Sequence, residues 1–179
     1  MKRLVIVYLM LLTACSLTPK QQPALHDFGV QAVSSPVKLV GKSDISVDTP
    51  PWLSDDCIHY RLLTSSPTQL RCYNLDKWIA PPAELFRQQL LASGKFPNQR
   101  LQIQLLDFEQ QFDTPKQARV VLHFIVDAYD LDANRLIATQ DFRLEQRTAT
   151  ADADGAVTSF ARLTQQAINQ LQQWLLTTH

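Results

Sequence analysis

Glycine is scarce in this chain, and its scarcity excludes several kinds of site. The 179 residues include four glycines, Gly29, Gly41, Gly94 and Gly155, and none of them is near another. Phosphate-binding loops and dinucleotide fingerprints need closely spaced glycines, so neither is predicted. A Gly-x-Ser-x-Gly elbow is absent too, which leaves a lipase-type serine nucleophile without its motif.

Metal-ligand motifs and clusters of one charge are also missing. The sequence has no His-x-x-x-His pair and no Cys-x-x-Cys, so local spacing predicts no metal site. Lysine and arginine total 17, and so do aspartate and glutamate. This balance, without a basic cluster, argues against a nucleic-acid-binding surface. Because no catalytic or cofactor-binding constellation is visible, we expect a protein that is not an enzyme and carries no cofactor.

The N-terminus has the order of an export signal. Two basic residues precede an apolar segment, 4–12, that is too short for the roughly 20 residues of a membrane span. The ending Leu12-Thr13-Ala14-Cys15 resembles a bacterial lipobox. That resemblance implies a signal peptide over residues 1–14, cleavage before Cys15, and acylation of its thiol and its new amine. The alternative is an ordinary signal peptide in which Cys15 is incidental.

An acylated Cys15 would tie the chain to a membrane, since two or three acyl chains anchor stably at about 0.8 kcal/mol per buried CH₂. An aspartate after the cysteine would resemble an inner-membrane retention signal. Ser16 stands there instead, which favours the outer membrane, facing the periplasm. Residues 15–24 are interpreted as the lipidated cysteine and its tether, and residues 16–24 span about 30 Å when extended. The folded domain is then expected over residues 25–179.

Two cysteines remain after Cys15, namely Cys57 and Cys72. An even pair in an oxidising compartment predicts a disulfide between them. Two free buried thiols are the alternative.

The apolar periodicity predicts one α+β domain. Alternation indicates strands over residues 25–33, 38–47, 101–108, 118–129 and 135–146, with a β-hairpin made by 57–63 and 70–73 around a turn at 64–68. Helical spacing indicates one helix over 83–92 and another that follows Asp154, its expected N-cap, as far as Leu175. We therefore expect an antiparallel-rich sheet with two helices packed on one face.

Trp52, Trp78 and Ile79 are candidates for partner binding. Each tryptophan either packs in the core or serves as an aromatic anchor for a partner protein. Trp78 is the better candidate of the two, because Pro81 and Pro82 stiffen the segment beside it.

A series of short motifs runs along the mature chain: Ile45-x-Val47, Pro51-x-Leu53, Ile58-x-Tyr60-Arg61, Tyr73-x4-Trp78-Ile79-Ala80-Pro81-Pro82, Leu85-Phe86, Leu90 and Leu105-Leu106-Asp107-Phe108. Together they resemble the ABC-type transport auxiliary lipoproteins, the PqiC-like partners of Pqi- and Mce-type lipid-transport systems. Two features depart from that family. A tyrosine-bearing first strand is usual, where this chain has His26-Asp27-Phe28, and the Cys57 and Cys72 pair is not a general family feature.

The resemblance implies a non-enzymatic accessory of intermembrane lipid transport that supports envelope integrity. Its expected partner is an Mce-domain protein, anchored in the inner membrane and spanning the periplasm. The alternative function is that of an outer-membrane assembly or structural lipoprotein, such as a lipopolysaccharide-insertion accessory, and a periplasmic enzyme ranks third. Self-association into a homo-oligomer is left open by the sequence.

Overall fold

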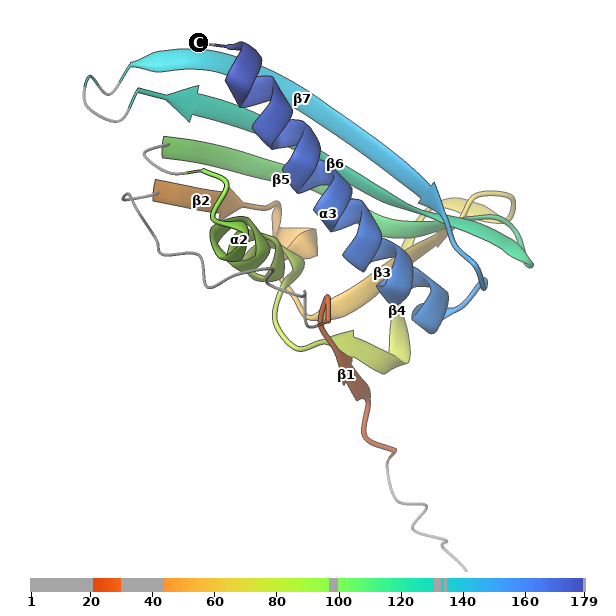
Figure 1. The fold of residues 1–179 in the computed structure, drawn as a ribbon. Coiled ribbons are helices and arrows are strands. Elements are labelled where there is room, and N and C mark those ends of the chain that lie inside the picture. Colours follow the sequence, from red (N-terminus) through yellow and green to blue (C-terminus); the bar gives the residue numbers. More distant parts are fainter. Residues whose placement is uncertain (1–20, 30–43, 97–99, 131–132, 134, 179) are drawn as a thin grey trace, which may run out of the picture.

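The computed structural model describes residues 21–29, 44–96, 100–130, 133 and 135–178. These residues form one mixed sheet of seven strands in the order β1-β4-β3-β5-β6-β7, with β2 also paired to β5. Helices α2 and α3 lie against one face of this sheet (Figure 1). The α+β architecture expected from the periodicity is therefore confirmed. The signal sequence and Cys15 lie outside the described residues.

A three-stranded antiparallel meander makes up most of the sheet: β5 (Arg100–Thr114), β6 (Gln117–Tyr129) and β7 (Leu136–Arg147). In β6 the even-numbered residues from Ala118 to Ala128 are buried, because alternate side chains of a strand point to the same face. β5 extends well past the predicted end at residue 108. Its polar continuation is paired with β6 as far as Thr114.

The predicted hairpin is present, with a longer second strand. It consists of β3 (Cys57–Leu62) and β4 (Ser66–Trp78), so β4 continues beyond Tyr73. The register of the pair shifts between the partners of Cys57 and those of His59. Such a shift accommodates extra residues of β4 in a bulge, which the sequence pattern did not indicate.

Parallel pairings complete the sheet, and the sequence did not predict them. β2 (Asp44–Asp48) and β3 both run parallel to β5, at residues 100–104 and 109–112. β1 (Ala24–His26) runs parallel to the last residues of β4. The first strand is thus shorter than the 25–33 that we expected, and residues 30–33 and 38–43 lie outside the described part of the chain.

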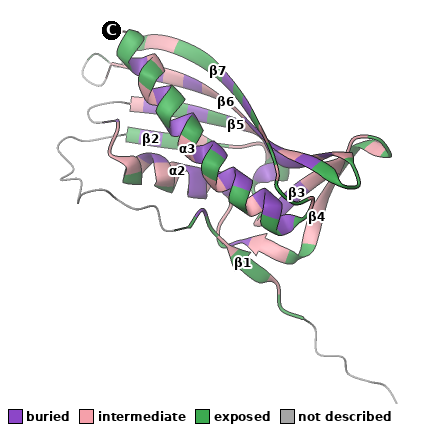
Figure 2. Cartoon of the chain, turned by 45° about the vertical axis from the view of Figure 1, so that its right-hand side comes forward, coloured by how far each residue is buried: buried purple, intermediate pink, exposed green. Residues whose placement is uncertain are grey.

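Two helices cover the core face. α2 (Pro82–Ser93) begins with a proline, as Pro82 suits the first helical position, and ends at Gly94, whose φ of 62° is left-handed. α3 (Ala153–Thr177) buries its apolar stripe against the sheet and exposes its glutamine-rich side (Figure 2). No helix in the described part of the chain is both long enough and apolar enough to cross a membrane.

The expected cap of α3 was wrong by two residues. Asp152 is the N-cap, and its carboxylate accepts a hydrogen bond from the backbone N–H of Gly155 at 2.8 Å. Asp154 lies in the first turn instead. The extended backbone of Asp152, with φ at −151°, directs its side chain at the third helical N–H, which is the geometry of a cap.

The core between sheet and helices is built around a cluster of aromatic rings. Trp78, at the end of β4, has ring centroids of Phe28, Phe108 and Phe160 within 5.4 to 5.8 Å. Phe108 and Phe160 stack at 3.9 Å. The cluster therefore joins the segment after β1, the end of β4, the middle of β5 and α3 in one core.

Candidate functional site

Trp78 is a core residue. Its side chain is 1% exposed and is surrounded by the aromatic rings described above. A partner protein cannot contact a ring that the fold itself encloses. The preference for Trp78 over Trp52 is therefore reversed by the structure, and the core alternative holds for Trp78.

Trp52 has the opposite environment. It is 60% exposed on η1 (Pro51–Leu53), a single 3₁₀ turn, while the next residue, Leu53, is buried in the core. The turn is fixed by a hydrogen bond from the Leu53 N–H to the Pro50 carbonyl at 2.9 Å and by one from the Ser54 hydroxyl to the Pro51 carbonyl at 2.6 Å. Trp52 is thus a large aromatic side chain held on the surface by a rigid turn.

Ile79 is also exposed, at 61%, and two other apolar residues lie near it. Leu25 of β1 pairs with Lys77 of β4, and the Ile79 N–H donates to the His26 carbonyl at 2.8 Å, so the ladder continues past Trp78. Side chains two residues apart share a face. Leu25 and Lys77 are register partners and therefore share the face opposite His26 and Trp78. Leu75 and Ile79 stand two residues before and two residues after Lys77 in the chain, and both are exposed.

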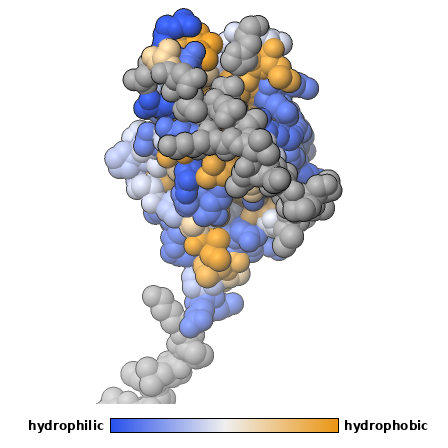
Figure 3. Space-filling model, turned by 60° about the vertical axis from the view of Figure 1, so that its left-hand side comes forward, coloured by the Kyte–Doolittle hydropathy of each residue, from blue (hydrophilic) through white to orange (hydrophobic). Residues whose placement is uncertain are grey.

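We call Leu25, Leu75 and Ile79 the β1 patch. Leu25 is 62% exposed and Leu75 is 47% exposed. Figure 3 shows apolar side chains gathered at the lower end of the molecule, the height at which β1 lies in Figure 1. Of these three residues only Ile79 was a predicted candidate, because an apolar residue in a strand is ordinarily a core residue.

The expected disulfide is present in the structure. Cys57 and Cys72 are bonded, with their Cα atoms 5.5 Å apart, within the range that a disulfide requires. Cys72 pairs across the hairpin with His59 rather than with Cys57. The bond therefore spans the register shift and fixes the bulge of β4 at its base.

His59 lies beside this disulfide and is buried. Its Nε2 is 3.5 Å from Asp55 Oδ1, and its Nδ1 finds no hydrogen-bond partner among the described residues. Burial lowers the pKa of His59 below its ordinary value, and the nearby carboxylates of Asp55 and Glu109 oppose that shift only in part. The neutral imidazole is therefore favoured in the folded protein.

Among the described residues, two groups of side chains have metal-ligand atoms close together. Asp55, Cys57 and His59 form one, but the Cys57 sulfur is already bonded to Cys72. His26, Asp76 and Asp154 form the other, with ligand atoms within 4.8 Å of one another. In this second group His26 Nε2 and Asp76 Oδ1 lie 2.9 Å apart and share a hydrogen bond. It ties β1 to β4 close to the first turn of α3.

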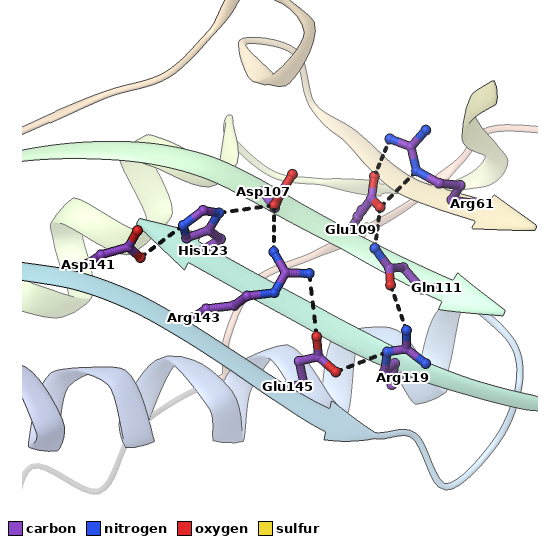
Figure 4. A network of polar contacts seen from close by, with 9 residues as sticks. All are labelled: Arg61, Asp107, Glu109, Gln111, Arg119, His123, Asp141, Arg143 and Glu145. Carbon is purple, nitrogen blue, oxygen red and sulfur yellow. Dashed lines mark hydrogen bonds and ion pairs between the residues drawn. The ribbon is translucent and has the colours of Figure 1, made fainter. Parts of the chain in front are cut away.

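The sheet face away from the helices carries a polar network (Figure 4). It runs from strand to strand through nine residues: Arg61, Glu109, Gln111, Arg119, Glu145, Arg143, Asp107, His123 and Asp141. Each of its carboxylates contacts an arginine or His123, and the Gln111 amide links Glu109 to Arg119. The network was not predicted, although the polar residues at every second position in the later part of β5 and in β7 are a signal for it.

Comparison with known proteins identifies the fold. No family model matches this chain, and no curated protein matches it either. A protein from Xanthomonas campestris described as DUF330 has a similar structure, with a TM-score of 0.71 over 87% of this chain and 95% of its own, at 16% identity. An uncharacterized protein has a TM-score of 0.68 over 86% and 99%, at 15% identity. Similarity at these identities shows a shared fold.

Proposed function

We propose that the protein is a lipid-anchored accessory of the outer membrane, facing the periplasm, and that it serves an Mce- or Pqi-type lipid-transport system. In this proposal it binds a partner protein that carries the lipid and catalyses no reaction itself. Energy and lipid handling come from other components of the system.

The observation that carries the proposal is the motif Tyr73-x4-Trp78-x2-Pro81-Pro82, on which the family resemblance depends. Each of its residues has a place in the fold. The Tyr73 hydroxyl donates to Gln110 Oε1 at 2.7 Å, Trp78 fills the core, and Pro82 begins α2. The motif thus supports the resemblance as a fold signature, and the accessory role follows from the resemblance.

Membrane anchoring is supported by the lipobox-like sequence before Cys15 and by the short stretch between it and β1. The test is Cys15→Ser in the full chain. We expect the variant to remain an uncleaved, unacylated precursor in intact-mass measurements, whereas the wild type loses residues 1–14 and gains acyl chains. A Cys15→Ser chain that is still acylated would remove the anchor from the proposal.

Trp52 is the side chain best placed to contact the partner. Interface hot spots are enriched in tryptophan, and truncating one typically costs about 2 kcal/mol or more of binding free energy. The neighbouring Leu53 is buried in the core, and hydrogen bonds hold the same turn, so the ring is presented with little loss of conformational entropy on binding.

The decisive experiment is co-purification from envelope membranes with the lipidated full chain as bait. We expect an Mce-domain protein to be captured by the wild type and captured much less by Trp52→Ala. Leu176→Ala is the matched control, because Leu176 is an exposed apolar residue at the far end of α3. Thermal melting must show both variants as stable as the wild type.

The outcomes separate the competing functions. Undiminished capture by a folded Trp52→Ala variant would exclude Trp52 from the interface while keeping the partner. Capture of a lipopolysaccharide-insertion protein, with no Mce-domain protein, would favour the assembly lipoprotein instead. A wild-type bait that retains no Mce-domain protein from cells that express one would overturn the proposed function.

A further inference from the structure

The β1 patch is an apolar surface with little net charge. Leu25, Leu75 and Ile79 are each about half exposed or more. The cation among them, Lys77, lies 2.9 Å from the Asp56 carboxylate and forms an ion pair with it. The surface is therefore aliphatic, and the one charge that it contains is compensated within the protein.

The composition of the patch favours lipid over protein as its occupant. Protein hot spots are enriched in tryptophan, tyrosine and arginine, and leucine is under-represented among them. The patch has none of the three enriched types, and Trp52, an exposed aromatic residue in the described part of the chain, belongs to a different element, η1. Aliphatic side chains gain free energy in a bilayer without a shape-matched pocket.

The position of the patch in the chain also favours lipid as its occupant. Leu25 is the second residue of β1, and about ten residues separate it from Cys15. Even fully extended, ten residues reach only about 35 Å. An acylated Cys15 therefore keeps the patch within a short distance of the bilayer at all times. That closeness gives a weak apolar contact a high effective concentration.

We propose that the β1 patch is a membrane-contact surface that rests on the bilayer in which Cys15 is anchored. This inference depends on the lipid anchor of the proposed function. Leu25, Leu75 and Ile79 enter the interfacial region, and the aliphatic stem of Lys77 lies along it. The contact fixes the orientation of the body. The C-terminal end of α3 lies at the opposite end of the molecule (Figure 1) and so points into the periplasm.

The first test uses Leu25→Cys in the full lipidated chain. The sequence has three cysteines; with Cys15 acylated and Cys57 bonded to Cys72, the introduced thiol is the free one and takes a single environment-sensitive fluorophore. Leu176→Cys is the matched control, since Leu176 is 73% exposed at the other end of the molecule. Both proteins are reconstituted in vesicles of phosphatidylethanolamine and phosphatidylglycerol, with and without nitroxide-labelled lipid.

We expect the fluorophore at position 25 to shift to the blue and to be quenched severalfold more by the nitroxide lipid than the fluorophore at position 176. Equal quenching at the two positions, or none at position 25, would overturn the proposal. A blue shift that grows with the protein-to-lipid ratio, without quenching by the nitroxide lipid, would also overturn the proposal. In that case a second copy of the chain covers the patch.

A second test changes the patch itself. In the Leu25→Cys background, Ile79→Glu places a carboxylate where an aliphatic side chain should enter the interface, and we expect the quenching to fall severalfold. Leu176→Glu should leave it unchanged. Thermal melting confirms that the variants fold. Intact-mass measurement separates the lipid anchor from the membrane contact. An unacylated Cys15 would contradict the anchor. An acylated chain in which the fluorophore at position 25 stays in water would contradict only the membrane contact of the β1 patch.

Discussion

Arg61 of β3 and Glu109 of the parallel strand β5 are diagonal neighbours, and two hydrogen bonds join their side chains. Arg61 Nε lies 2.9 Å from Glu109 Oε1, and Arg61 Nη2 lies 2.9 Å from Oε2. The Glu109 side chain is buried, and its bond to the guanidinium raises the pKa of Arg61. A paired fork of this kind both satisfies the buried carboxylate and fixes the register of two strands that are far apart in sequence.

Removing the cation should leave that carboxylate buried without its charge partner. We expect Arg61→Met to lower the free energy of unfolding by about 3 kcal/mol, the lower end for a broken buried pair, because Arg61 itself is partly exposed. Arg87→Met is the control. Arg87 pairs with Glu84 on the exposed side of α2, where a pair is worth about 1 kcal/mol or less. Urea denaturation gives both values, and equal losses would contradict the role assigned to Glu109.

The disulfide should contribute strongly to stability. Cys57 and Cys72 are 15 residues apart, and a loop of this length gives about 3 kcal/mol in the chain-entropy model. The double variant Cys57→Ser with Cys72→Ser should therefore unfold at a clearly lower urea concentration. Peptide mapping under non-reducing conditions provides the control, since it must show the linked peptides in the wild type. Unfolding midpoints that are the same with and without the bond would contradict this prediction.

The capping residue of α3 can be identified by two adjacent substitutions. Asp152→Ala removes the acceptor of the Gly155 N–H and should cost about 1 kcal/mol. Asp154→Ala removes a first-turn carboxylate that caps nothing, so only the smaller interaction with the helix dipole, about 0.5 kcal/mol, is lost. Thermal melts of the two variants decide the question. A larger loss for Asp154→Ala would restore the cap that the sequence suggested.

His59 should make the protein less stable in mild acid. Burial lowers its pKa in the folded state, whereas the unfolded chain has the ordinary value of about 6.5. Below that pH the unfolded state binds more protons than the folded state, so stability falls as the pH falls through about 6.5. We expect His59→Phe to lose less stability than the wild type between about pH 7.5 and about pH 5.5. The other histidines are common to both proteins, so parallel pH profiles would contradict the prediction.

The meander and the long helix were predictable because their signals are local. The alternation from Ala118 to Ala128 and the helical spacing around Phe160 and Leu171 each depend on neighbouring residues alone. The parallel pairings of β1, β2 and β3 were not predictable, since a single sequence does not show which distant strand a short apolar run will pair with. These pairings determine the order of the strands in the sheet, so the strand order could not be predicted from the apolar pattern.

The candidate site illustrates the same limit at single residues. Trp78 and Ile79 are adjacent in sequence, yet one fills the core and the other is on the surface. Their environments follow from the phase of β4 against β1, which depends on the bulge after Cys72. Trp52 is exposed because Leu53 takes the buried position of the same turn. Sequence indicated that these residues were candidates, and only the register decided which of them face solvent.

The three residues of β1 have a mechanical consequence in the anchored protein. Among the described residues β1 pairs only with β4, and it is the first element after the tether. Tension between the membrane and the body is therefore applied to a ladder of three residues before it reaches any other strand. Because β4 belongs to the disulfide-linked hairpin, the load passes from β1 into that hairpin through these three residues. We expect this short ladder to separate before the long pairing of β5 with β6, so that β1 is released while the meander stays paired.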